Sequence, residues 1–172
     1  MNKYFSLKSA AALSLLFLLN AGCAGYRVGS MLPTDVETIY VPTVLNKSGE
    51  PLIEVELTQA IAQEIQKDGS LTIVPEDQAD TVLTVVLLDY NLEPVSFQKT
   101  DRSAANQYRI NLTASLVLRR TSDQSVVAEA PRVKGQAVFD VVGDLSSSKR
   151  NGNPLAAEDL GKRIVQRIVE YW

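Results

Sequence analysis

The sequence predicts an α+β domain: a two-layer sandwich in which a mostly antiparallel sheet carries two amphipathic helices on one face. Two observations predict it. Several segments alternate apolar and polar residues with the period of two that a strand requires, most clearly residues 107–119. Two segments, one after Pro51 and one after Pro154, repeat apolar residues at helical spacing. The expected order of elements along the chain is β-α-β-β-β-β-α.

Residues 37–45 (ETIYVPTVL) are rich in β-branched side chains and predict the first strand, which Pro42 marks as an edge or irregular strand. After a turn at residues 46–50, Pro51 suits the first position of a helix, because its missing N–H is not needed there. Gly69 is a suitable end for this helix. The apolar stripe consists of Ile53, Leu57, Ala60, Ile61 and Ile65. The polar face is not enriched in Lys or Arg, so we expect the helix to pack on the sheet rather than on a membrane.

Residues 71–74 predict a brief strand, residues 80–92 a strong one, and residues 93–106 a long polar connector. The strong strand is apolar on both faces, as in a strand that is covered on both sides. One face is expected to carry Val82, Thr84, Val86, Leu88 and Tyr90, and the other Leu83, Val85 and Leu87. Either the domain covers both faces itself, or a partner covers the second.

The last strands are residues 107–119 and 126–142, where Pro131 predicts an edge position or a bulge. Residues 143–153 predict a loop. The terminal helix is then expected to begin with Asn153 as its N-cap and Pro154 in its first position. The apolar stripe of this helix is Leu160, Ile164, Val165, Ile168 and Trp172.

The first 22 residues have the layout of a cleaved secretory signal peptide: Lys3 and Lys8, then an apolar run, then small residues. The run is about ten residues long, whereas a helix that spans a bilayer needs roughly 20. Cys23, the only cysteine of the chain, follows directly. The segment resembles the lipobox of bacterial lipoproteins, in which this cysteine is lipidated, although Asn20 departs from the usual aliphatic residue. The ordinary alternative is a secreted soluble protein with an incidental cysteine.

The expected domains are therefore the signal peptide at residues 1–22, the lipidated N-terminus and linker at residues 23–36, and one folded domain at residues 37–172. Several acyl chains on Cys23 would make a durable membrane anchor, because one chain alone binds only marginally.

The composition argues against most chemistry. The chain has no histidine and a net charge of −3, so the commonest general base and metal ligand are missing, and no basic excess points to nucleic acid. It contains no serine-hydrolase, zinc-protease or phosphate-loop motif. Asp140 and Asp144 are better explained as solvated surface carboxylates than as a catalytic pair. We expect no enzyme, no cofactor and no metal.

The chain resembles the lipopolysaccharide-assembly lipoproteins of the LptE type. The resemblance rests on Cys23 with Gly25-Tyr26 shortly after it, on ETIYVPTVLNKSGEPLIEVELTQAIAQEI, on ADTVLTVVLLDY, on the strand from Tyr108 to Leu118, and on RIVQRIVEYW. It implies a non-catalytic outer-membrane lipoprotein that faces the periplasm and carries acyl chains such as palmitate. Such proteins sit as a plug inside a β-barrel translocon of the LptD type and help deliver lipopolysaccharide.

A second resemblance stays open beside the first. The opening YVPTVLNKSGEP, followed by a helix and LTIVPEDQAD, also resembles periplasmic lipoproteins that activate peptidoglycan synthases, and those related to the curli-secretion component.

In an up-and-down sheet, the connector before Gln107 and the loop after Val142 leave from the same end. Four cations would then gather there: Lys99, Arg102, Lys149 and Arg150. We hypothesise that they contact the phosphates of lipopolysaccharide, for which loop cations are suitable partners. The ordinary alternative is that loop tips are charged because they are solvated.

Overall fold

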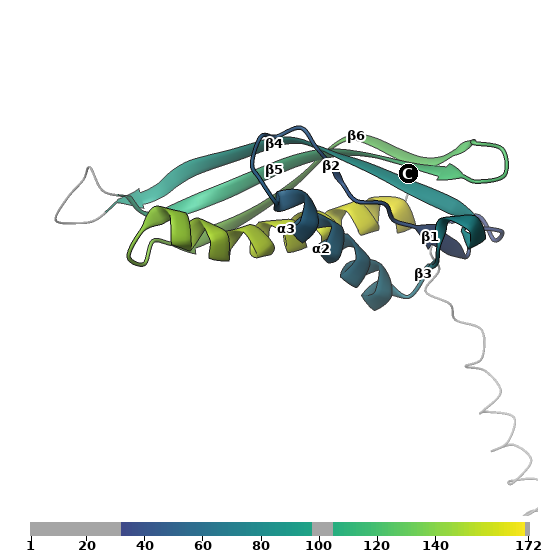
Figure 1. Ribbon diagram of the computed structural model, residues 1–172, viewed down its shortest axis with the longest axis horizontal. Helices are drawn as coiled ribbons and strands as arrows, with labels where there is room; N and C mark the ends of the chain where they lie inside the picture. The colour runs from purple at the N-terminus through teal and green to yellow at the C-terminus, as the bar shows by residue number, and fades with distance from the viewer. Residues whose placement is uncertain (1–31, 98–104, 171–172) are drawn as a thin grey trace, which may run out of the picture.

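The computed structural model describes residues 32–97 and 105–170, so the predicted signal peptide, Cys23 and Trp172 lie outside the described residues. A six-stranded sheet forms one layer, and two helices form the other layer on one face of that sheet (Figure 1). The predicted two-layer α+β sandwich is confirmed.

The strands follow the order β3-β1-β4-β5-β6 across the sheet, and β2 also pairs with β4. The short strands pair in parallel, whereas the three long strands pair antiparallel. The described elements are β1 (Thr38–Tyr40), β2 (Leu45–Asn46), α2 (Ile53–Asp68), β3 (Thr72–Ile73), η2 (Glu76–Gln78), β4 (Thr81–Phe97), β5 (Ala105–Arg120), β6 (Val126–Asp140) and α3 (Leu145–Val169).

The core lies between the helices and the inner face of the sheet, the face on which the helices pack. Each helix buries the stripe predicted for it within the described residues, except that Ala60 is only half-buried. The buried members are Ile53, Leu57, Ile61 and Ile65 of α2, and Leu160, Ile164, Val165 and Ile168 of α3. From the sheet, β4 contributes Leu83, Val85 and Leu87. Burying each large aliphatic side chain stabilises the fold by roughly 1.5–3 kcal/mol, so these stripes fix which face of each helix meets the sheet.

Two glycines let the backbones approach closely. A Cβ on Gly135 of β6 would lie 2.5 Å from the Cβ of Leu160, and a Cβ on Gly161 of α3 would lie 3.1 Å from the backbone of Ala60. Gly135 therefore allows α3 to pack closely on the sheet, and Gly161 allows α3 to pack closely on α2.

The first predicted strand is interrupted at its proline. Residues 41–44 separate β1 from β2, so Pro42 marks an irregular strand, as one of the two expectations had it. Pro131 likewise falls at a bulge on the edge strand β6, because Ala114 pairs with Val133 but Leu116 pairs with Ala130.

The long polar connector predicted for residues 93–106 is wrong at both ends. β4 continues to Phe97 and β5 begins at Ala105, because the polar residues there pair across the two strands, as Glu93 does with Arg109. A bulge at Leu88 also reverses the alternation: Leu87 pairs with Ala114, but Asp89 pairs with Thr113. The prediction that Tyr90 shares a face with Val82 is therefore wrong; Tyr90 packs against the core.

The loop predicted for residues 143–153 is also wrong, since α3 begins at Leu145. Asp144 caps the helix by accepting a hydrogen bond from the backbone N–H of Ser147 at 2.9 Å. Gly152 and Asn153, which read as helix breakers, are buried, and Pro154 lies inside the helix. Packing on the sheet overrides their low helix propensity.

The outer face of the sheet, opposite the helices, has no second layer among the described residues (Figure 1). Val82 and Val86 of β4 are half-buried there, and Leu88 is 39% exposed. The sequence left two explanations for the apolar second face of this strand: cover by the domain itself, or cover by a partner. The described residues do not cover this face.

Candidate functional site

The sheet tip is the end of the sheet where Phe97 pairs with Ala105, and Gln107 pairs with Asp140. β4 ends, β5 begins and β6 ends at this end of the sheet, and α3 begins close to it (Figure 1). The predicted topology of the tip is thus confirmed. Lys99 and Arg102, two of the four cations expected there, lie outside the described residues.

Lys149 is in α3 rather than in a loop, and its charge is paired. Its Nζ lies 2.8 Å from the Oε1 of Glu50, which belongs to the turn before α2. The same Nζ lies 5.8 Å from the centre of the Tyr90 ring, in cation–π range. Lys149 therefore joins the start of α3 to β4 and to the turn before α2.

Arg150, the next residue, points elsewhere and is exposed. Its Nη2 donates a hydrogen bond to the Oγ of Ser147 at 2.8 Å. The backbone N–H of Ser147, with a smaller contribution from Arg150, holds the pKa of Asp144 below its usual value. The structure thus does not gather Lys149 and Arg150 into one cluster: Lys149 is half-buried in an ion pair, and Arg150 faces solvent near the tip.

The sequence alone did not indicate the apolar side chains of the tip. Phe97 is 50% exposed and Val142 is 79% exposed. Phe97 belongs to the stretch expected to be a polar connector, and Val142 is the last residue of the stretch expected to be a strand. A tip with an exposed aromatic ring, an exposed valine and a solvent-facing arginine has both apolar and cationic contacts to offer an amphiphilic ligand.

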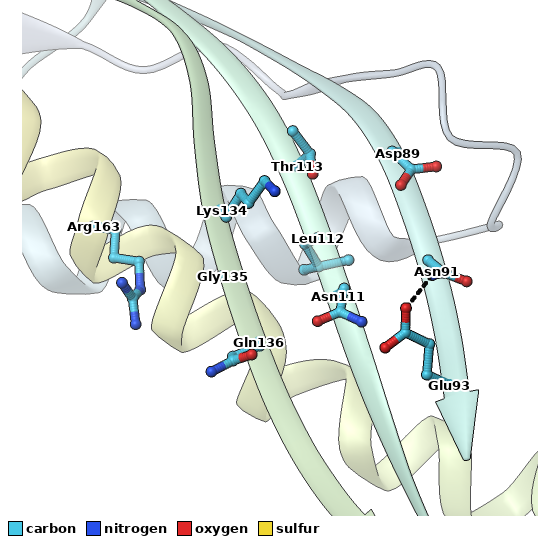
Figure 2. Close-up of a pocket in the computed structure, with 10 residues that line it drawn as sticks. All are labelled: Asp89, Asn91, Glu93, Asn111, Leu112, Thr113, Lys134, Gly135, Gln136 and Arg163. Atoms are coloured by element: carbon cyan, nitrogen blue, oxygen red, sulfur yellow. Dashed lines mark hydrogen bonds between the residues drawn. The ribbon is translucent and has the colours of Figure 1, made fainter. Parts of the chain in front are cut away.

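The outer face of the sheet carries a shallow polar hollow of about 440 Å³ (Figure 2). Its polar side chains come from all three long strands, and Arg163 of α3 adds one beyond β6 (Figure 2). The lining consists of Asp89, Asn91, Glu93, Asn111, Leu112, Thr113, Lys134, Gly135, Gln136 and Arg163. Asn91 donates a hydrogen bond to Glu93 at 2.8 Å. Carboxylates and cations occur together in this open hollow.

Within residues 32–97 and 105–170, no three potential metal ligands of the His, Cys, Asp or Glu type come together. In the same part of the chain, neither helix combines the length and apolar character that a membrane span requires.

The fold places the chain among small α+β sandwiches with helices on one face of the sheet. It is similar to a protein from Xanthomonas campestris, with 13% identity and a TM-score of 0.53 over 85% of this chain and 92% of that one. It is also similar to a Caulobacter crescentus protein, with 11% identity and a TM-score of 0.52 over 75% and 89% of the two chains. The minor lipoprotein of Acinetobacter baumannii has 11% identity and a TM-score of 0.51 over 80% and 94%.

The sequence model of the LptE family, described as lipopolysaccharide-assembly, matches residues 36–171. The chain belongs to this family, which confirms the first of the two resemblances. No functionally curated protein matches the sequence.

Proposed function

We propose that this protein is a non-catalytic outer-membrane lipoprotein that assists a β-barrel translocon of the LptD type in delivering lipopolysaccharide. The observation that carries the proposal is the family match, which spans nearly the whole folded domain. In this proposal Cys23 is lipidated after removal of residues 1–22, and the domain faces the periplasm.

The one-sided sheet supports a role as a binding partner. On its outer face, Leu88 is 39% exposed, Val126 is 45% exposed and Val138 is 46% exposed, and Val82 and Val86 are half-buried. Apolar side chains on a face that the described residues leave uncovered are suited to contact with another protein. The wall of a barrel is the partner that the family implies.

Lipopolysaccharide contact is proposed at the sheet tip, through Lys99, Arg102, Lys149 and Arg150. Among the two described members, Arg150 is the better placed because it is exposed, whereas Lys149 would have to leave Glu50. Phe97 lies at the end of β4, where its exposed ring is suited to the acyl chains of the same ligand.

The partner is tested by affinity purification of the mature lipoprotein from detergent-solubilised outer membranes. We expect a large β-barrel to co-purify, and depletion of the protein to reduce surface lipopolysaccharide. Recovery of a cell-wall synthase together with normal surface lipopolysaccharide would instead favour the second resemblance. Labelled palmitate should appear on the wild-type protein and not on Cys23→Ala.

The tip is tested with purified lipopolysaccharide and the protein in neutral detergent. Arg150→Glu should weaken binding, whereas Lys162→Glu, an exposed charge reversal elsewhere on α3, should not. Lys149→Gln is compared with Lys149→Gln/Glu50→Gln, because only the double variant removes the cation without leaving Glu50 unpaired. Unchanged binding in both Arg150→Glu and the double variant would exclude the described part of the tip.

A further inference from the structure

A basic groove of about 370 Å³ lies between the edge strand β6 and the C-terminal half of α3. Four cations line it: Arg132 and Lys134 from the strand, and Arg163 and Arg167 from the helix. Glu170 is the one carboxylate in the lining. This concentration of positive charge is unexpected in a chain whose net charge is −3.

Only one of the four cations is neutralised within the described residues. The Nε of Arg163 lies 2.9 Å from the Oδ2 of Asp159. The side chains of Arg132, Lys134 and Arg167 are exposed and form no ion pair or hydrogen bond within residues 32–97 and 105–170. Three cations therefore face the groove with their charge available to a ligand.

Two ordinary roles explain part of this arrangement. Charged residues on an edge strand hinder pairing with other chains, which would account for Arg132 and Lys134. A cation in the last turn of a helix interacts favourably with the helix dipole, which would account for Arg167. Neither role requires the strand and the helix to line the same hollow. The i,i+4 spacing of Arg163 and Arg167 also costs a few tenths of a kcal/mol in like-charge repulsion.

We propose that the basic groove is an anion-binding site that takes the phosphate groups of a phosphorylated ligand. Guanidinium groups match phosphate oxygens through paired N–H donors, and lysine adds a point charge. The groove is separate from the sheet tip, because Arg150 and Arg163 lie roughly 20 Å apart along α3 at 1.5 Å per residue. The inference therefore does not rest on the proposed lipopolysaccharide contact at the tip.

The test uses the mature lipidated protein in neutral detergent micelles, titrated with inorganic pyrophosphate and followed by backbone amide chemical shifts. Shift changes should concentrate at β6 and the C-terminal half of α3. Arg132→Gln/Arg167→Gln should weaken binding about tenfold, since two exposed charge contacts are removed. The matched control is Lys47→Gln/Lys162→Gln, which removes two exposed charges outside the groove and should bind as the wild type does. Arg163 is left intact because it also holds Asp159.

Two competition arms identify the source of the phosphate. Displacement of pyrophosphate by diphosphoryl lipid A would assign the site to a phosphorylated glycolipid, and displacement by phosphatidylglycerol vesicles would assign it to the bilayer surface. Displacement by neither would support a soluble phosphorylated ligand. The proposal is overturned if the groove variant binds as tightly as its control, or if the shift changes spread evenly over the surface cations.

Discussion

The carboxylate of Asp159 on α3 accepts a hydrogen bond from the backbone N–H of Gln136 on β6, at 2.8 Å. β6 is the edge of the sheet, where outward N–H groups have no neighbouring strand. Arg163 donates to the same oxygen at 2.9 Å and so helps to hold the carboxylate in place. A helix side chain thus occupies a backbone donor that would otherwise be open to another chain.

We expect Asp159→Ala to lower the free energy of unfolding by about 1 kcal/mol, because one charge-assisted hydrogen bond is lost. The exposed N–H should also promote concentration-dependent self-association. Urea unfolding measures the first effect, and sedimentation velocity measures the second. Glu158→Ala, which removes a neighbouring exposed carboxylate, should leave both unchanged. Identical behaviour of the two variants would show that the contact contributes nothing.

Alanine substitutions at the two close-contact glycines, Gly135 and Gly161, should differ in their effect on stability. Gly135→Ala would place a Cβ 2.6 Å from the backbone nitrogen of Leu160, so strand and helix must separate. We expect a loss of about 1–3 kcal/mol, typical of overpacking. Gly161→Ala meets Ala60 at 3.1–3.2 Å and gains helix propensity of about 1 kcal/mol, so its net effect should be small. Urea midpoints compare the two, and equal losses would contradict the difference in contact.

Much of this fold is readable from the sequence because periodicity reports which face is buried. The stripe from Ile53 to Ile65 and the alternation of β5 follow from that alone, and both proline irregularities were predictable. The start of α3 was not, since Gly152, Asn153 and Pro154 oppose a helix locally and only packing on the sheet overrules them. The bulge at Leu88 could not be predicted either, because an extra residue in one strand is defined only by its pairing with the neighbouring strand.

The candidate site was less predictable than the fold, for the same reason. Spacing in the sequence placed Lys149 and Arg150 together, but adjacent residues on a helix point in different directions. The pairing of Lys149 with Glu50 joins residues 99 positions apart. Likewise, Arg132 and Arg167 line one groove because an edge strand and a helix lie side by side. Such convergence of distant residues requires the structure.

Acid should loosen the attachment of β1. The hydroxyl of Thr38 and the backbone N–H groups of Glu37 and Thr38 donate to the carboxylate of Asp80, and they hold its pKa below the usual value of 3.8. A carboxyl with a lowered folded-state pKa contributes stability above its unfolded pKa, and this is lost as the pH falls through the folded pKa. Stability should therefore decline below about pH 4.

Asp80→Asn should be less stable than the wild type at pH 7 and should lose less stability between pH 5 and pH 2. Urea midpoints measured across that range test the effect, with Asp77→Asn as the exposed control in η2. Some acid dependence will remain, because the pKa values of Asp35 and Asp144 are also lowered. A slope identical to that of the wild type would show that Asp80 does not anchor β1.

The hydroxyl of Tyr90 donates a hydrogen bond to the Oδ1 of Asn153 at 2.8 Å, and Asn153 is only 8% exposed. Tyr90→Phe keeps the ring but leaves this buried oxygen without its donor, so we expect a loss of about 1–3 kcal/mol in the free energy of unfolding. Tyr108→Phe is the matched control: its ring stacks on Phe139, and its hydroxyl makes no hydrogen bond within the described residues. That variant should stay within about 0.5 kcal/mol of the wild type.

Alkaline titration gives the same residue a second readout. Burial, with a smaller contribution from the charge of Glu50, raises the pKa of the Tyr90 phenol above its usual value of 10.0. Since the unfolded chain releases this proton more easily, stability should fall as the pH rises above about 10, and Tyr90→Phe should reduce that fall. Absorbance at the phenolate band counts the tyrosines that ionise only well above pH 10, and Tyr90→Phe should have one fewer of them than the wild type. If both proteins titrate alike, the Tyr90 phenol is not buried in solution.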